Sequence, residues 1–482
     1  MCSVSVLPGV IMIFNTPIFF AFFVVFLLGY GFIFLKHKPK VYFTLVASLV
    51  FYGSWNYHFI PLLVGSAVAD YFIAQAIGNA ASQRHKKWLV TLSLCINLGI
   101  LGLFKYADFA LSSVGSFLTL FGYEASLPTL AWILPVGISF YTFQSLSYTI
   151  DVYRGDMQPR KGLLEFTAAL AFFPQLVAGP ILRARHILPQ MHDIQLPSFA
   201  QVKTGFLLIT VGLMKKTTAD LLAGPAATAF DGQQTISVLE TWSGVLAFAG
   251  QIYGDFSGYT DMAIGIALLL GFNFPLNFRV PYFAVSPVDF WRRWHISLST
   301  WLRDYLYISL GGNRNNRRMR NVMITMLLGG LWHGAAWTFI AWGAFHGVII
   351  TATHYLSNLA VFKPFAASNN KFHIVLKWAI TFYLVLLGWV LFRATSLENA
   401  WQVICDMHSF GGALPAASSL AITIFALVSA ALILMHLLDY FVLNHSKKLE
   451  SKGWLFWPLL VLGQALCLLI GEPSNDFIYF QF

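Results

Sequence analysis

Long stretches of apolar residues with almost no charge constrain this chain more than any other feature of its sequence. Charged residues make up only 10% of the 482 residues, whereas a soluble domain uses about 25%. The excess of 10 positive charges falls in short basic clusters between apolar stretches, which is typical of membrane orientation. The composition therefore excludes a soluble globular enzyme, a disordered tail and a nucleic-acid-binding domain. It predicts a polytopic protein of the inner membrane, embedded in the lipid bilayer.

The apolar stretches predict an all-α integral membrane protein. A helix needs about 20 residues to cross the hydrocarbon core. Some stretches are short or interrupted by Gly and Pro, so re-entrant and interfacial segments are expected among roughly eleven to thirteen membrane-embedded helices. The predicted helices lie near 17–35, 41–59, 61–78, 88–104, 107–122, 130–150, 163–180, 204–223, 240–270, 321–340, 341–357, 375–392, 418–440 and 454–470.

We expect one transmembrane domain over residues 12–482, with its motifs concentrated between about 134 and 346. Residues 1–11 lack the basic start of a signal peptide, and Met12 is itself a natural start, so 1–11 is interpreted as a mis-assigned extension. Basic loops such as Arg314–Arg320 are predicted to be cytoplasmic. The four cysteines lie far apart, without metal-ligand spacing, so no metal site is predicted.

The first polar stretch, residues 281–312, combines aromatic and basic residues. Ser286, Pro287 and Asp289 form a helix start signal. The aromatic residues that follow recur at spacings of three and four and predict an amphipathic helix at the membrane interface. An anchor helix would explain the aromatic face, but it leaves His295 and its basic neighbours unexplained. The charged candidates for substrate binding are Arg292, Arg293, Arg303 and Asp304, and the three arginines could neutralise anionic phosphates such as those of coenzyme A.

The second polar stretch, residues 323–346, contains His333. It lies 13 residues after Arg320, which is about 20 Å along a helix and deep in a hydrocarbon core of about 30 Å. An ionisable group at that depth is a functional candidate. The alternative is a core histidine that is hydrogen-bonded between closely packed helices. An imidazole can take a proton from a hydroxyl near neutral pH, so acyl transfer is the reaction class that fits.

A third polar stretch, residues 254–261, interrupts an apolar region and contains Asp255, Ser257 and Asp261. The aspartates could line a cavity, or they could pair internally with buried cations or backbone amides.

Motifs for a serine elbow, zinc proteolysis, nucleoside triphosphate binding and dinucleotide binding are absent from the sequence.

Taken together, these motifs resemble the membrane-bound O-acyltransferases, and in particular the bacterial alginate O-acetylase branch. The similarity runs in order from about Met12 to Ala400. The segments that carry it are Phe104–Tyr106, Leu134–Tyr141, Ile150–Gly155, Asp255–Ala263, Asp289–Tyr307, Leu331–Ala335 and Leu391–Ala394.

The resemblance implies a ring of tilted helices around a central funnel. It implies that His333 is catalytic with His295 as its companion, and that Trp332 and the third polar stretch contribute to substrate binding. It also implies no bound cofactor. Acetyl-coenzyme A in the cytoplasm would donate acetyl groups across the bacterial inner membrane to a periplasmic acetyltransferase partner protein, which would esterify a polysaccharide such as alginate.

The motifs do not select the polymer, so O-acetylation of peptidoglycan or of another exopolysaccharide stays open. Two further alternatives belong to other classes. One is a lipid acyltransferase, and the other is a proton-coupled transporter in which His333 and the aspartates line the proton path.

Overall fold

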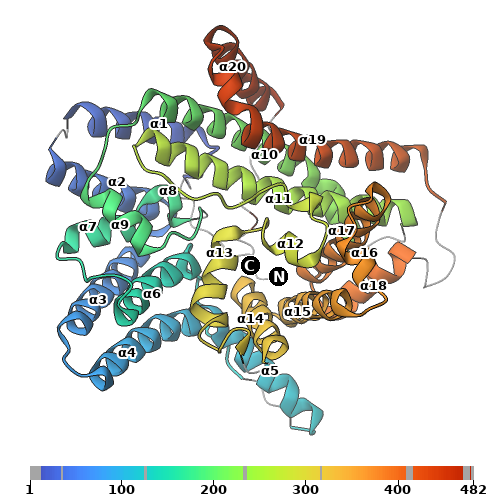
Figure 1. Ribbon diagram of the computed structural model, residues 1–482, viewed down its shortest axis with the longest axis horizontal. Coiled ribbons are helices and arrows are strands. Elements are labelled where there is room, and N and C mark those ends of the chain that lie inside the picture. The colour runs from blue at the N-terminus through green and yellow to red at the C-terminus, as the bar shows by residue number, and fades with distance from the viewer. Residues whose placement is uncertain are drawn as a thin grey trace. The chain divides into compact units, whose positions relative to one another are not determined.

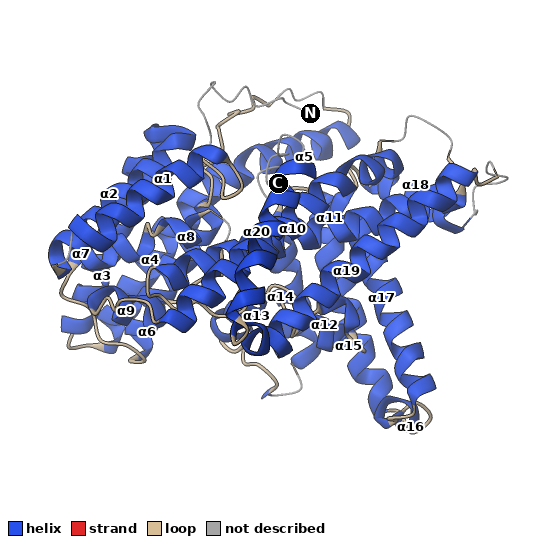
Figure 2. Cartoon of the chain, turned by 90° about the horizontal axis from the view of Figure 1, so that it is seen from above, coloured by secondary structure: helices blue, strands red, loops and turns tan. Residues whose placement is uncertain are grey.

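The computed structural model describes residues 12–33, 36–123, 127–177, 179–231, 236–314, 317–408, 416–470 and 478. Helices and loops make up this described part of the chain, and no strand occurs in it (Figures 1 and 2). The predicted all-α architecture is therefore confirmed. The expected extension at residues 1–11 lies outside the described residues.

Five helical stretches in these described ranges are long and apolar enough to cross a membrane. This confirms the predicted multi-pass membrane protein. Several predicted helices join into longer ones, because the helical backbone continues through short 3₁₀ or π-helical turns. The five stretches are His37–Asn79, Gln83–Leu120, Trp337–Asn358, Lys371–Arg393 and Ser419–Ser446.

The chain forms two compact units, and the expectation of one domain over 12–482 stays a prediction. The first unit contains residues 1–202 and 266–274. Its helices are α1 (Pro17–Leu28), α2 (His37–Asn56), α3 (Ile60–Asn79), α4 (Gln83–Leu101), α5 (Ala107–Leu120), α6 (Ile138–Arg154), α7 (Leu163–Leu170), α8 (Phe173–Leu176) and α9 (Ala184–His192).

A buried polar cluster joins three helices of the first unit. The carboxylate of Asp70 on α3 accepts hydrogen bonds from Ser93 Oγ at 2.6 Å and Asn97 Nδ2 at 2.7 Å, both on α4. Ser145 on α6 donates a further hydrogen bond to the same carboxylate. Because each of these donors offsets part of the cost of burying the charge, the cluster holds the helices in register.

Two predicted helix boundaries in this unit are wrong. The helix expected at 130–150 begins only at Ile138, since Pro135 and the left-handed Gly137 (φ +73°) precede it. The segment expected at 163–180 is divided into α7 and α8, and Pro174 stands in the first turn of α8. Proline lacks a backbone donor, so it is tolerated at a helix start and disfavoured in a helix interior.

The second unit contains residues 203–265 and 275–482, and the candidate site lies entirely within it. Its helices are α10 (Phe199–Phe230), α11 (Val238–Leu269), α12 (Pro287–Trp291), α13 (Ile296–Trp301), α14 (Arg318–His333), α15 (Trp337–Asn358), α16 (Lys363–Ala367), α17 (Lys371–Arg393), α18 (Leu397–His408), α19 (Ser419–Glu450) and α20 (Gly453–Ile470). Residues 199–202 of α10 and 266–269 of α11 are assigned to the first unit.

Helices α14 and α15 pack side by side as an antiparallel pair (Figure 1). A side chain on Gly330 of α14 would collide with the carbonyl oxygen of Phe339, and one on Gly343 of α15 would collide with that of Met326. Glycines at the crossing thus let the two backbones approach closely. The boundary between the pair lies at Gly334–Ala336, some residues earlier than the predicted 340, because Gly334 has an extended backbone that ends α14.

Candidate active site

His333 is the last residue of α14, and it is 4% exposed. The helix is continuous from Arg318, so the rise of about 1.5 Å per residue that was assumed for the sequence-based estimate applies here. Aromatic rings surround the imidazole, with centroid distances of 5.0 Å to Trp332, 5.1 Å to Trp342 and 5.2 Å to Phe392. The histidine therefore lies in a tightly packed apolar setting.

His295 lies at a sharp break in the chain, where a continuous helix was predicted. The structure contains α12, a left-handed His295 (φ +42°), α13 and a π-helical turn at Leu302–Tyr307. Asn277, which lies outside this segment, stabilises the break by accepting hydrogen bonds from its backbone. Its carbonyl oxygen accepts from Ile296 N at 2.8 Å, and its side-chain Oδ1 accepts from Ser297 N at 3.1 Å.

The predicted helix start is confirmed, but the aromatic face is directed differently from the expectation. Ser286 caps α12 by accepting a hydrogen bond from Asp289 N at 3.1 Å. Trp294 and Trp301, which were expected at the membrane interface, are only 1% and 7% exposed. These side chains pack inside the protein, because the turn at His295 folds the segment back on itself.

The two candidate catalytic histidines lie near each other. Their ring centroids are 6.5 Å apart, and Trp332 lies 6.0 Å from His295. His295 is fully buried, and its Nδ1 is 3.1 Å from Asn277 Oδ1. This contact fixes the orientation of the imidazole ring.

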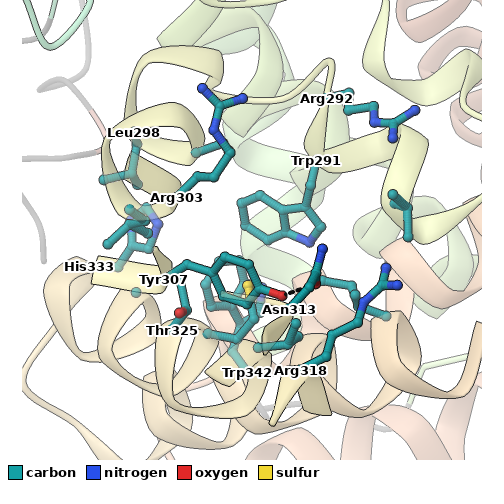
Figure 3. Close-up of a pocket in the computed structure, with 17 residues that line it drawn as sticks. Trp291, Arg292, Leu298, Arg303, Tyr307, Asn313, Arg318, Thr325, His333 and Trp342 are labelled. Carbon is teal, nitrogen blue, oxygen red and sulfur yellow. Dashed lines mark hydrogen bonds between the residues drawn. The ribbon is translucent and has the colours of Figure 1, made fainter. Parts of the chain in front are cut away.

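A cavity of about 380 Å³ reaches His333 and is lined by basic, aromatic and aliphatic side chains (Figure 3). Its volume is typical of a small-molecule site. His333 lines the cavity, whereas His295 and Trp332 are not among its lining residues. The walls comprise Val288, Trp291, Arg292, Leu298, Ser299, Leu302, Arg303, Tyr307, Asn313, Arg318, Val322, Thr325, Met326, Gly329, His333, Trp342 and Ile350.

Arginines from three separate segments line this cavity, namely Arg292, Arg303 and Arg318 (Figure 3). Arg303 Nε donates to Asp304 Oδ1 at 2.6 Å, and this hydrogen bond raises the pKa of Arg303 above its ordinary value. Arg318 Nη1 lies 2.7 Å from His354 Nε2. Guanidinium groups around a cavity favour an anionic ligand, and phosphate in particular.

Arg293, the other predicted phosphate ligand, lies outside the cavity lining. Its Nε donates to Asp289 Oδ1 at 2.9 Å, one helical turn earlier. Arg292 and Arg293 thus have different surroundings, although they are neighbours in the turn that follows α12.

The polar residues predicted at 254–261 lie on α11 and are not among the residues that line the cavity. Asp255 pairs with Lys216 at 2.8 Å and also accepts a hydrogen bond from Ile478 N at 2.6 Å. Asp261 pairs with Lys215, while Ser257 is fully buried. The substrate-binding role of these residues stays a prediction.

Sequence reasoning overlooked several residues of this region. Lys215 and Lys216 lie within an apolar helix, and their pairing with the aspartates could not be read from spacing. Arg318 was used only for membrane orientation, although it belongs to the densest basic cluster of the chain. Trp342 carried no signal beyond its proximity in sequence to His333. In the described ranges, His, Cys, Asp and Glu side chains form no group of three that could hold a metal ion.

This arrangement suits transfer of an acyl group from an anionic carrier. The arginines can bind phosphates, and the cavity can admit a narrow chain. The imidazole at its wall can take a proton from a hydroxyl nucleophile.

Comparisons with known proteins agree with this chemistry. The model of the membrane-bound O-acyltransferase family matches residues 160–397. A probable alginate O-acetylase of Azotobacter vinelandii is 44% identical over 410 residues, which cover 83% of this chain and 79% of the relative. A peptidoglycan O-acetyltransferase of Helicobacter pylori is 38% identical over 447 residues, which cover 85% and 82%. A teichoic acid D-alanyltransferase of Bacillus subtilis is 26% identical over 282 residues, which cover 55% and 70%.

The resemblance seen in the motifs is thus confirmed over most of the chain. The family supplies the reaction class, an O-acyl transfer from a donor to an acceptor. The apolar helices supply the multi-pass membrane character. The chain belongs to the membrane-bound O-acyltransferase family and is a multi-pass O-acyltransferase.

Proposed function

We propose that this enzyme transfers acetyl groups from acetyl-coenzyme A for the O-acetylation of a cell-envelope polysaccharide, with alginate as the first candidate. The observation that carries the proposal is the cavity that His333 shares with Arg292, Arg303 and Arg318. The names of the relatives support the acetyl group and the polysaccharide, since two of them are O-acetylating enzymes of envelope polymers.

The cavity supports coenzyme A as the carrier. Its phosphates would meet the arginines, while the pantetheine arm would extend along the largely apolar walls towards His333. The arginine guanidinium matches phosphate oxygens in two-pronged geometry. The ring centroids of Trp332, Trp342 and Phe392 lie within 5.2 Å of the centroid of the imidazole, which leaves little space around it. This crowding supports a short acyl group such as acetyl.

In the proposed reaction His333 acts as general base. It takes the proton of the acceptor hydroxyl while the hydroxyl oxygen forms a bond to the thioester carbonyl carbon. The carbonyl electrons move to the oxygen and then return as the carbon–sulfur bond breaks, and the leaving thiolate takes the proton from the imidazolium. The products are an ester and free coenzyme A. His295, oriented by Asn277, would help to position the reactants.

The basic loops support a location in the bacterial inner membrane, with the donor on the cytoplasmic side. We further propose that the acetyl group leaves on the periplasmic side through a partner acetyltransferase, which esterifies the polymer. No bound cofactor is required by this scheme.

Peptidoglycan is the second candidate acceptor. The Helicobacter pylori peptidoglycan O-acetyltransferase matches 85% of this chain, about as much as the 83% that the Azotobacter vinelandii relative matches. A lipid acyltransferase remains an alternative with another acceptor, and it is an outcome of the tests below. The proton-coupled transporter is set aside by the membership of the O-acyltransferase family.

The donor is tested with purified protein in detergent and acetyl-coenzyme A, by measuring the free thiol that is released. We expect release that depends on His333 and on an added hydroxyl acceptor. A protein that binds the thioester without consuming it would contradict acetyl-coenzyme A as the donor. Transfer of the acetyl group to phospholipid would favour the lipid acyltransferase.

The acceptor is tested in cells by measuring base-labile acetate in purified exopolysaccharide and, separately, in peptidoglycan. The cells carry the intact gene, a deletion, or His333→Ala expressed at an equal level. Loss of acetate from exopolysaccharide in both altered strains supports the alginate-type assignment. Loss confined to peptidoglycan would replace the polymer but keep the chemistry.

A further inference from the structure

Trp342 shares the cavity wall with His333 and carries a buried N–H donor for which the described residues provide no acceptor. The side chain is 1% exposed, and its ring lies 5.1 Å from the imidazole at an interplanar angle of 84°. Among the residues that the structure describes, none accepts a hydrogen bond from its Nε1. Nε1–H is the sole polar group of this side chain.

Other tryptophans of the same unit do have acceptors for this group. Nε1 of Trp291 donates to His346 Nδ1 at 3.3 Å. Nε1 of Trp242 donates to the Met407 carbonyl at 2.9 Å, and that of Trp378 donates to the Tyr282 carbonyl at 2.8 Å. A buried indole N–H ordinarily finds a partner, so the group on Trp342 calls for an explanation.

Trp389 resembles Trp342 in its burial and in its N–H group, but it differs in its access to the cavity. It is also 1% exposed, its Nε1 also has no acceptor in the described ranges, and its ring lies 6.4 Å from that of Trp342. Trp389 is not among the residues that line the cavity. Burial in the aromatic cluster is therefore common to both residues, whereas access to the cavity beside His333 belongs to Trp342.

The fold holds Trp342 firmly in this place. It directly precedes Gly343, the glycine at the close crossing of α14 and α15, where a side chain would collide with the Met326 carbonyl. The indole is also packed between His333 and His346, whose ring centroid lies 4.8 Å away. A donor that is fixed before the reaction needs no reorganisation when charge develops.

We propose that Trp342 is a further catalytic residue, whose Nε1–H donates a hydrogen bond to the thioester carbonyl oxygen and stabilises the oxyanion. This inference rests on the acetyl-transfer function proposed above. When the acceptor oxygen bonds to the carbonyl carbon, the electron pair of the C=O bond moves to the oxygen beside Trp342, while His333 holds the proton. When the carbon–sulfur bond breaks, the pair returns and the hydrogen bond weakens.

The test compares Trp342→Phe with Trp389→Phe in purified protein, measuring thiol release from acetyl-coenzyme A with an added acceptor. Both changes remove an indole N–H from the same aromatic cluster, and only the first is beside the cavity. Loss of one oxyanion donor lowers kcat by about 100-fold or more. We expect a loss of that size for Trp342→Phe with KM for the donor nearly unchanged, and near wild-type kinetics for Trp389→Phe.

A second variant separates the donor from the packing. Incorporation of benzothienylalanine at position 342 replaces the N–H by sulfur and keeps the shape of the ring system, so it is used whether or not Trp342→Phe folds well. A similar loss of kcat in this protein supports the inference. Wild-type kcat with benzothienylalanine at 342, or equal losses in the Trp342 and Trp389 proteins, would overturn it. Wild-type protein that releases no thiol would instead overturn the proposed function, and the inference with it.

Discussion

Two regions of the second unit bring ionisable side chains together, and they differ in what their cations face. Both buried lysines lie on α10, and each faces two carboxyl groups. Lys215 pairs with Asp261 and, at 2.7 Å, with Asp439, while Lys216 pairs with Asp255 and Asp220. In the cavity, by contrast, Arg292, Arg303 and Arg318 line an open space beside His333.

This difference teaches that a buried charge is not by itself a sign of a binding site. The lysine and aspartate network pairs both cations with carboxyl groups of the protein itself, and it connects α10, α11 and α19. At the cavity Arg303 pairs with Asp304, while Arg292 and Arg318 carry positive charge that a ligand can balance. Structural ion pairs and ligand sites look alike in the sequence, because both appear as polar residues within apolar stretches.

The largest effect that we expect is on catalysis at His333. His333→Gln keeps a polar side chain of similar size but cannot act as a base near neutral pH. General base catalysis contributes about 10²–10⁴-fold, so kcat for thiol release should fall by about 10³-fold. Thermal unfolding in detergent is the control for folding. Full activity in a folded variant would end the assignment of His333 as the base.

The next effect concerns the stability of the paired network. Lys215→Met leaves the carboxylates of Asp261 and Asp439 without this cation in an apolar interior. Removing one partner of a buried pair costs about 3–5 kcal/mol. Unfolding in detergent micelles should show a loss of this size. If the variant were equally stable but had lost acetyl transfer, the network would belong to the functional site, and the two regions would not differ in the way described above.

A smaller effect should separate two neighbouring arginines. Arg292→Gln removes a cavity cation, and the loss of a charge-assisted hydrogen bond of about 1.5 kcal/mol raises KM for acetyl-coenzyme A by about tenfold. The matched variant Arg293→Gln disrupts only the pair with Asp289. Its KM should stay close to the wild-type value. Equal KM values for the two variants would contradict the assignment of the phosphate site to the cavity.

The smallest effect is expected for the exposed ion pair at the cavity rim. The Arg303 side chain is 60% exposed where it meets Asp304. Exposed pairs contribute less than about 1 kcal/mol, so Asp304→Asn should change the free energy of unfolding by no more than that. A loss as large as that of Lys215→Met would show that exposure does not distinguish the two kinds of pair.

Much of the fold could be predicted from the sequence because its signals are local. Apolar stretches gave the all-α membrane class, and the Ser286 start signal gave the beginning of α12. The break at His295 could not be predicted from the aromatic spacing. It depends on Asn277, which lies 18 residues away and holds the chain through its carbonyl and side-chain oxygens.

For the candidate site, the sequence alone determined the reaction class, the motif histidines and the position of His333 along its helix. The reaction class and the histidines follow from the motifs that resemble the family, and the position of His333 follows from the helical rise, so each depends on residues that are close in sequence. Only the tertiary structure decided that Asp255 and Asp261 meet lysines, and that Arg318 and Trp342 share a cavity with His333. The physical reason is that such partners come from different helices, such as Lys215 and Asp439 at 224 residues' separation. Helix packing, rather than local spacing, determines which of them meet.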